Sequence, residues 1–316
     1  MTRQVKGFDK KDGVVISKVK AAKLSMAAIS FLILIKLVAS ILTGSIGIRA
    51  DALHSTLDLI AAVIAFIGVK VSDKPADKRH PYGHGKAENI SSVLVAGLIF
   101  MAAGTIVYEA IKRLISGVTL ELVGIGIAVT AAAIAINLFI SWYVLRVSRA
   151  TDSIALEASA RHMITDVLSS VAVLVGLIAV QITGLNILDS IVALAVAGLI
   201  VKSAFDIMRK SFGGLIDARL PESEEDIIRS AIMEHTGEVV DFHELRTRKA
   251  GSQRYIDLHL VMPRNISVEE AHRMCDHLER DIKGKLRQAS VTIHVEPYRK
   301  DSEQGPVPSE TRKKES

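Results

Sequence analysis

The chain has 316 residues, of which 49% are hydrophobic and 23% are charged, and its formal net charge is +5. The apolar residues are gathered into long blocks, which excludes a single soluble domain. The one cysteine, Cys275, excludes an internal disulfide framework and argues against a zinc site built from thiolates. No basic patch is interleaved with aromatic residues, so the positive charge does not indicate a nucleic acid partner.

Six stretches are apolar and long enough to cross a bilayer, because a hydrocarbon core of about 30 Å takes roughly 20 residues of helix. The first stretch has no small-residue cleavage site near its end, which favours a retained helix over a signal peptide. We therefore expect a membrane domain that is an all-α bundle of six helices. The predicted spans are residues 21–43, 46–69, 89–109, 122–146, 154–182 and 187–205.

Lysines and arginines gather on one side of this predicted bundle. They occur before the first helix and in the connections after the second, fourth and sixth helices, whereas the opposite connections are short and nearly uncharged. By the positive-inside rule, both termini face the cytoplasm. The sequence thus predicts a multi-pass integral membrane protein.

Ionisable residues interrupt two of the apolar stretches. His54 and Asp58 are four residues apart in the second stretch, and the same spacing returns in the fifth at His162 and Asp166. Residues four apart lie on one face of a helix. A charged group at bilayer depth costs roughly 2.5–3.5 kcal/mol, so such side chains face a bundle interior or a polar path. Two imidazoles with two carboxylates supply the four ligands of a tetrahedral zinc site, and we predict a metal site there.

The connection between the second and third helices, residues 74–88, holds another dense group of polar residues. Its two prolines and two glycines oppose helix formation and favour turns. Asp77, His80 and His84 can hold a metal ion there, with water completing the coordination shell. The alternative is that they are ordinary polar residues of a solvated loop, and their spacing does not decide between the two.

The long apolar runs stop after the sixth helix, and from residue 211 the composition is that of a soluble domain. Its periodicity predicts the order α-β-β-α-β, a small α+β domain, with elements at residues 223–235, 239–247, 254–262, 267–286 and 290–295. The predicted division is an N-terminal cytoplasmic segment 1–20, a transmembrane domain 21–210, a cytoplasmic domain 211–297 and a disordered tail 298–316.

Six of the ten histidines lie in this cytoplasmic domain, which suggests metal binding. Strand alternation places His259 on the same face as Tyr255 and Asp257. Two histidines, His235 and His277, are expected to be ordinary solvated side chains. The candidate ligands for one or two zinc sites are His243, His259, His272, His294 and Glu296.

Four motifs in this chain resemble those of the cation diffusion facilitators. They stand at Ala50–Asp58, His80–Glu88, His162–Asp166 and His243–Arg248. The resemblance covers the chain from the first helix to Pro297. It implies six spanning helices, a metallochaperone-like cytoplasmic domain that binds metal and dimerises, a homodimer, and export of divalent cations in exchange for protons.

The resemblance also implies that the candidate metal-binding residues named above are metal ligands. One departure is His54, because the first ligand is often aspartate in the iron and zinc branch of the family. The resemblance further places Lys86 and Asp217 near the dimer seam, where we predict that they pair and hold two copies of the chain in register.

We therefore predict a secondary transporter and not an enzyme, with no resident cofactor. Zinc is the expected ion, with cadmium, cobalt, iron(II) and manganese as further substrates, because magnesium and calcium prefer ligand sets made of oxygen alone. The expected partners are divalent metal ions, protons, the lipid bilayer and a second copy of the chain, without nucleic acid.

Two alternatives come from other functional classes. A membrane metallohydrolase is the weaker one, because the chain has no His-Glu-x-x-His motif and four protein ligands leave no open position on zinc. The other is a metal-sensing dimeric scaffold, which a flux assay separates from an exporter.

Overall fold

The structure is a computed structural model that describes residues 17–43, 46–116, 124–183, 187–235 and 239–298. The segments before residue 17 and after residue 298 lie outside this set, as do some helical side chains, that of His54 among them. The chain forms two compact units. The helical unit comprises Met1–Ala218 with Lys249–Ser252, and the α+β unit comprises Arg219–Arg248 with Gln253–Ser316.

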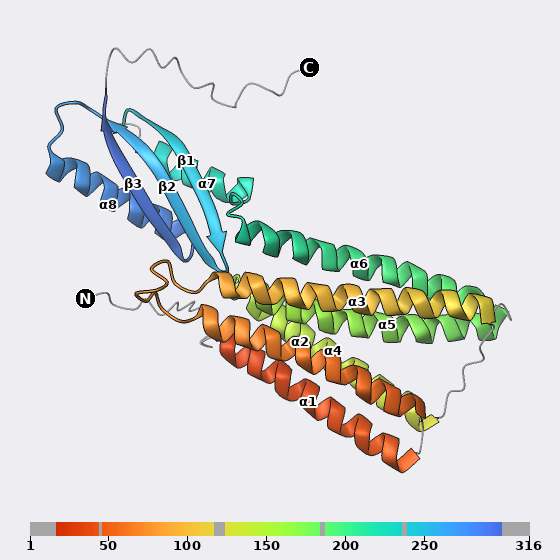
Figure 1. The fold of residues 1–316 in the computed structure, drawn as a ribbon. Coiled ribbons are helices and arrows are strands. Elements are labelled where there is room, and N and C mark those ends of the chain that lie inside the picture. The colour runs from red at the N-terminus through yellow and green to blue at the C-terminus, as the bar shows by residue number, and fades with distance from the viewer. Residues whose placement is uncertain (1–16, 44–45, 117–123, 184–186, 236–238, 299–316) are drawn as a thin grey trace, which may run out of the picture. The chain divides into compact units, whose positions relative to one another are not determined.

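The helical unit is built from long helices that lie side by side (Figure 1). Several of them run past the predicted apolar stretches, because polar residues continue the helix beyond its apolar part. The last one continues past residue 210, so the predicted change of domain falls inside it. The helices are α1 (Lys18–Thr43), α2 (Ile46–Ser72), α3 (Lys86–Ser116), α4 (Gly124–Thr151), α5 (Ile154–Thr183) and α6 (Ile187–Leu215).

Helices α2 and α5 occupy the centre of this unit, since each contributes to two separate groups of buried apolar side chains. Ala62 of α2 and Met163 of α5 pack with α1 and α4. Ala61 of α2 and Ala158 of α5 pack with α3 and α6. Small side chains let helices approach closely. Polar residues on α2 and α5 are therefore held inside the bundle.

The outer surface of the helical unit is apolar. Large hydrophobic side chains such as Phe31, Met101, Phe139 and Leu199 are more than half exposed. An exposed apolar surface of this extent indicates contact with another apolar surface or with lipid. Among the described residues, two helical segments are long and apolar enough to cross a membrane, Lys86–Lys112 and Ser190–Leu215.

A buried carboxylate ties several helix ends together. Glu88, at the start of α3, is fully buried. It accepts hydrogen bonds from Lys18 Nζ of α1 at 2.9 Å, Ser72 Oγ of α2 at 2.8 Å and Ser153 Oγ at 2.8 Å, just before α5. A buried charge needs such partners, because an unpaired one costs several kcal/mol.

The α+β unit contains two helices and a three-stranded sheet with strand order β1-β2-β3. Strands β2 and β3 are parallel. The two-residue turn between β1 and β2 makes those strands an antiparallel hairpin. Helix α8 begins with a capping box, in which Ser267 and Glu270 satisfy each other's backbone N–H groups. The elements are α7 (Glu222–Met233), β1 (Asp241–Ala250), β2 (Gln253–Met262), α8 (Val268–Lys285) and β3 (Ala289–Pro297).

One face of the sheet packs against both helices, and the other face carries the polar residues. On β2, Ile256 and Leu258 join a core that includes Ile228 of α7 and Leu278 of α8. Because side chains alternate along a strand, His259 lies on the opposite face. The sequence predicted this alternation.

Candidate metal centres

The first candidate centre lies between α2 and α5. Asp58, His162 and Asp166 offer ligand atoms that all lie within 4.8 Å of one another. Asp58 Oδ1 is 3.4 Å from His162 Nε2. Asp58 on α2 and Asp166 on α5 lie close together because both helices run through the centre of the bundle. His54, the fourth predicted ligand, lies on α2, but its side chain is outside the described set.

Several ligand atoms of Asp58 and His162 are buried without hydrogen-bond partners among the described residues. Asp58 Oδ1 and both ring nitrogens of His162 are buried and accept or donate no hydrogen bond within the described part of the chain. Asp58 is 9% exposed and His162 is 4% exposed. Buried polar atoms are normally satisfied, so such a group indicates a missing partner. A divalent cation could be that partner, because imidazole nitrogen and carboxylate oxygen are both zinc ligands.

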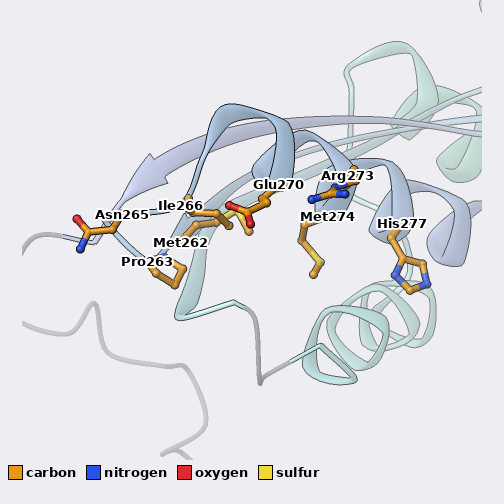
Figure 2. A pocket seen from close by; sticks show the side chains of 8 residues that line it. All are labelled: Met262, Pro263, Asn265, Ile266, Glu270, Arg273, Met274 and His277. Carbon is orange, nitrogen blue, oxygen red and sulfur yellow. The ribbon is translucent and has the colours of Figure 1, made fainter.

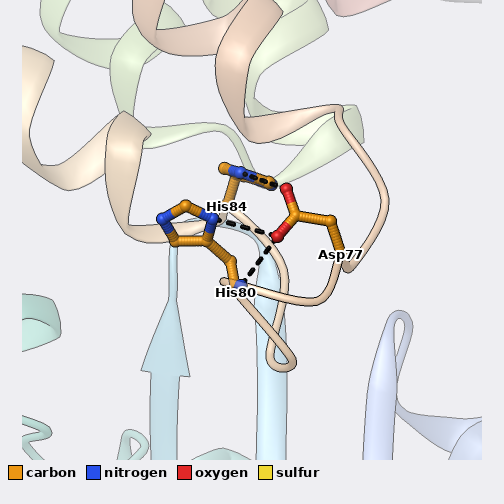
Figure 3. A group of neighbouring side chains, drawn as sticks. All are labelled: Asp77, His80 and His84. Carbon is orange, nitrogen blue, oxygen red and sulfur yellow. Dashed lines mark hydrogen bonds and ion pairs between the residues drawn. The ribbon is translucent and has the colours of Figure 1, made fainter.

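The second candidate centre lies in the loop between α2 and α3. Figure 3 shows the imidazoles of His80 and His84 next to each other, each facing a different oxygen of the Asp77 carboxylate. His80 Nδ1 is 3.1 Å from Asp77 Oδ1, and His84 Nε2 is 3.4 Å from Asp77 Oδ2. His84 Nδ1 is buried without a hydrogen-bond partner among the described residues. The structure thus brings together Asp77, His80 and His84, the three candidate ligands predicted from the sequence.

Backbone groups fix the Asp77 carboxylate. The N–H groups of Arg79 and His80 donate to its Oδ1 at 2.8 and 2.7 Å. The hydrogen bond from the His80 backbone is the main cause that lowers the pKa of Asp77 below its ordinary value. The carboxylate is therefore ionised over the physiological range, as a metal ligand must be.

The third candidate centre lies on the polar face of the sheet. His243, His259 and Glu296 form a group with ligand atoms within 4.8 Å of one another. His259 Nδ1 is 3.0 Å from Glu296 Oε1, and His243 Nε2 is 3.5 Å from Glu296 Oε2. In the parallel register His259 stands opposite His294, and their ring centroids are 4.8 Å apart.

A local irregularity in β1 brings a further carboxylate to this face. Phe242 and Leu245 both pack against the core, although strict alternation would place residues an even number apart on one face. Glu244, between them, has a φ of 50°, so the strand bulges there. Glu244 Oε2 thereby lies 3.7 Å from His259 Nε2.

His272 is the predicted ligand that does not join the sheet cluster. It lies on α8, its side chain is 74% exposed, and its Nε2 is 3.7 Å from Asp276 Oδ2. Helix α8 packs on the core face of the sheet, whereas His259 is on the other face. Within one chain, His272 is thus separated from the other candidate ligands.

A fourth group was not predicted from the sequence. His235, His277 and Asp281 also place ligand atoms within 4.8 Å of one another, although the two histidines were expected to be ordinary solvated side chains. The spacing of four residues between His277 and Asp281 was the available signal, since it places both on one face of α8.

The predicted ion pair between Lys86 and Asp217 is present within the helical unit. Lys86 Nζ is 3.0 Å from Asp217 Oδ1 and also donates to the backbone oxygen of Leu215 at 3.2 Å. The two side chains are 40% and 46% exposed. Lys86 begins α3 and Asp217 follows α6, so the pair connects the ends of these two helices.

Comparison with known proteins gives matches over most of the chain. A family model described as the cation efflux transmembrane domain matches residues 22–216, and one described as the cation efflux protein cytoplasmic domain matches residues 220–298. An uncharacterised transporter of Synechocystis is 37% identical over 87% of this chain and 89% of its own length. The cation-efflux pump FieF of Serratia proteamaculans is 34% identical over 88% of this chain and 93% of its own. Metal tolerance protein C1 of Arabidopsis thaliana is 30% identical over 88% of this chain and 62% of its own.

Proposed function

Because the chain belongs to the cation diffusion facilitator family, whose members are membrane proteins that export divalent metal cations, we propose that it exports zinc from the cytoplasm in exchange for protons. The observation that carries the proposal is the cluster of Asp58, His162 and Asp166. In it, Asp58 Oδ1 and both ring nitrogens of His162 are buried and lack hydrogen-bond partners among the described residues. One imidazole with two carboxylates, joined by His54 as the fourth ligand, suits a borderline ion such as zinc better than magnesium or calcium.

The proposed topology has six spanning helices, α1 to α6, with both termini in the cytoplasm. The exposed apolar side chains on these helices support contact with lipid, and the basic connections support the orientation. The proposed assembly is a homodimer, which the match to a cytoplasmic domain of cation efflux proteins supports.

The proposed path begins at the loop cluster. The ion meets Asp77 and His84, moves to Asp58, His162 and Asp166, and leaves on the opposite side of the membrane after the helices rearrange. Alternating access of this kind requires a binding site near the middle of the membrane and a bundle that moves around it. The central position of α2 and α5 is consistent with that requirement.

Proton coupling follows from competition for the same atoms. A metal ligand must be deprotonated, so a proton that binds a ligand displaces the ion. Imidazole is the side chain whose unperturbed pKa lies closest to neutrality. We therefore assign the proton to His162, and to His54 in the same site.

The first prediction concerns this site and is checked by measuring zinc-dependent proton flux in proteoliposomes. Asp166→Ala removes one ligand and one negative charge, so zinc-dependent proton flux should fall by tenfold or more. Asp206→Ala removes an exposed carboxylate from α6 and serves as the matched control, with flux close to that of the wild type.

The same assay separates the alternatives. Transport above half the wild-type rate in a folded Asp166→Ala protein would exclude this carboxylate from the site. Zinc binding by the wild type without any zinc-dependent proton flux would favour a metal-sensing scaffold over an exporter. A panel of zinc, cadmium, cobalt, iron(II) and manganese gives the ion preference.

A further inference from the structure

The group of His235, His277 and Asp281 joins the two helices of the α+β unit. His235 follows the end of α7, while His277 and Asp281 are one turn apart on α8. His235 Nε2 lies 2.8 Å from Asp281 Oδ2, and His277 Nε2 lies 3.8 Å from the same oxygen. The ring centroids of the two histidines are 4.9 Å apart. Three ligand-bearing side chains thus converge on one point.

The surroundings hold this geometry in place. The backbone N–H of His235 donates to the carbonyl of Ile232 at 3.0 Å, and its own carbonyl accepts from Val239 N at 3.2 Å. The His235 side chain is only 15% exposed. On α8, buried Leu278 and Ile282 flank the ligand positions and anchor the helix to the core. His235 and the α8 backbone are thus positioned before an ion binds, which reduces the cost of binding.

This group is separate from the zinc cluster on the sheet. Helices α7 and α8 cover the core face of the sheet, where Ile256 and Leu258 of β2 pack against them. His259 is on the opposite face of the same strand. The sheet therefore stands between the two groups, and one ion cannot bind both.

Water can reach the group from one side. A hollow of about 610 Å³ is lined by residues that include Met262, Glu270 and Met274, and His277 stands at one end of it (Figure 2). A zinc ion with three protein ligands takes a water molecule as its fourth ligand. The hollow leaves room beside His277 for that water.

We propose that His235, His277 and Asp281 form a further binding site for a zinc-like divalent cation, which fastens the end of α7 to α8. Two imidazoles and one carboxylate are a ligand set for zinc, and the remaining position is open to water. The site does not depend on the proposed transport function, because it lies on other elements and uses none of the transport residues. An ion there links two helices that otherwise meet mainly through apolar side chains.

The competing explanation is that His235 and Asp281 form only a structural hydrogen bond between helices. Asp281→Asn separates the two explanations, because an amide oxygen still accepts the hydrogen bond but lacks the charge of a ligand. Asp226→Asn, at an exposed position of α7, makes the same chemical change elsewhere.

The full-length protein in nanodiscs is dialysed against micromolar free zinc. The zinc that remains bound per chain is then measured by elemental mass spectrometry. The wild type and Asp226→Asn should bind one zinc more per chain than Asp281→Asn. Hydrogen exchange in residues 268–285 should slow on zinc addition in the wild type and not in Asp281→Asn. Equal zinc counts in all three proteins would overturn the proposal.

A second variant keeps the test decisive if Asp281→Asn folds poorly. His277→Cys replaces an imidazole with a thiolate, which is also a good ligand for zinc and cobalt(II). With cobalt(II) as the probe, this variant should gain a thiolate-to-cobalt charge-transfer absorption that the wild type, with Cys275 only, lacks. A folded His277→Cys protein without that absorption would show that position 277 does not coordinate the ion.

Discussion

Individual side chains on the polar face of the sheet are arranged by strand register. The parallel pairing of β2 with β3 sets His259 opposite His294, and Glu296 lies two residues further along the same face. The Glu296 carboxylate lies between the imidazoles of His243 and His259 and contacts both. A cation shared by these histidines would therefore contact the negative charge of Glu296.

The second prediction concerns that charge. Glu296→Gln should weaken zinc binding at the sheet cluster by about tenfold or more, equivalent to roughly 1.4 kcal/mol, because the amide keeps the size of the side chain and loses its charge. Glu269→Gln, an exposed position in the first turn of α8, is the control and should leave the affinity unchanged. Calorimetric titration of the full-length protein measures both. Equal zinc affinities in the two variants would mean that Glu296 is not a ligand.

Sequence periodicity predicts some of these positions and not others. Alternation along residues 254–262 correctly places His259 on the face opposite Ile256 and Leu258. It could not predict Glu244, because the left-handed backbone at that residue shifts the alternation of β1. It also could not predict the meeting of His235 with Asp281, since contacts between two helices depend on their packing and not on spacing within either one.

Between helices, the close approach of α2 to α3 depends on a glycine. A Cβ atom added at Gly68 of α2 would lie 2.0 Å from the Oγ and 2.5 Å from the Cβ of Ser91 on α3. Neither distance is possible without a shift of the helix, because Ser91 Cβ is fixed to the backbone. By contrast, a Cβ atom at Gly97 of α3 would meet nothing within 4 Å.

The third prediction follows from this pair of glycines. Gly68→Ala should destabilise the helical unit by about 1–3 kcal/mol, the usual cost of overpacking a core, while Gly97→Ala should have little effect or stabilise slightly. The unfolding temperature of each purified variant in detergent is measured by size-exclusion chromatography after heating, and the two temperatures are compared. If Gly68→Ala unfolds at the wild-type temperature, the helices are not in close contact at this point.

The helices themselves follow from apolar length, but their ends do not. The predicted stretch 89–109 lies within α3, which begins at Lys86 and ends at Ser116. Residues near the helix ends are polar because they lie beyond the apolar part of the bundle. Hydropathy therefore underestimates the length of the helix. The buried contacts of Glu88 also stabilise that end, and no hydropathy pattern reveals them.

In the assembled protein, the ion pair of Lys86 with Asp217 tests the proposed dimer. Both side chains are nearly half exposed in one chain, and an exposed pair contributes about 0–1 kcal/mol. A second copy that covers the pair would exclude water from it and strengthen the coupling. The strength of the pair therefore reports whether it lies at a dimer seam.

The fourth prediction is a double-mutant cycle with Lys86→Ala and Asp217→Ala, read as the free energy of dimer dissociation. A seam position predicts a coupling energy above about 1 kcal/mol between the two residues. Additivity within about 0.3 kcal/mol would place the pair away from the dimer contact.

The contacts of Glu88 join one end each of α1, α2, α3 and α5. At about 1.5 Å per residue, α3 is roughly 45 Å long, and Asp58 lies about 21 Å along α2 from Ser72. If the helices pivot at the Glu88 contacts, a tilt of about 5° moves Asp58 by roughly 2 Å and the far end of α3 by roughly 4 Å. Spin-label pairs placed along α2 and α3 should then report distance changes that grow with separation from Glu88, and equal changes at both ends would exclude a pivot there. With such a pivot, a shift of about 2 Å at Asp58 would become an opening about twice as wide at the far end of α3.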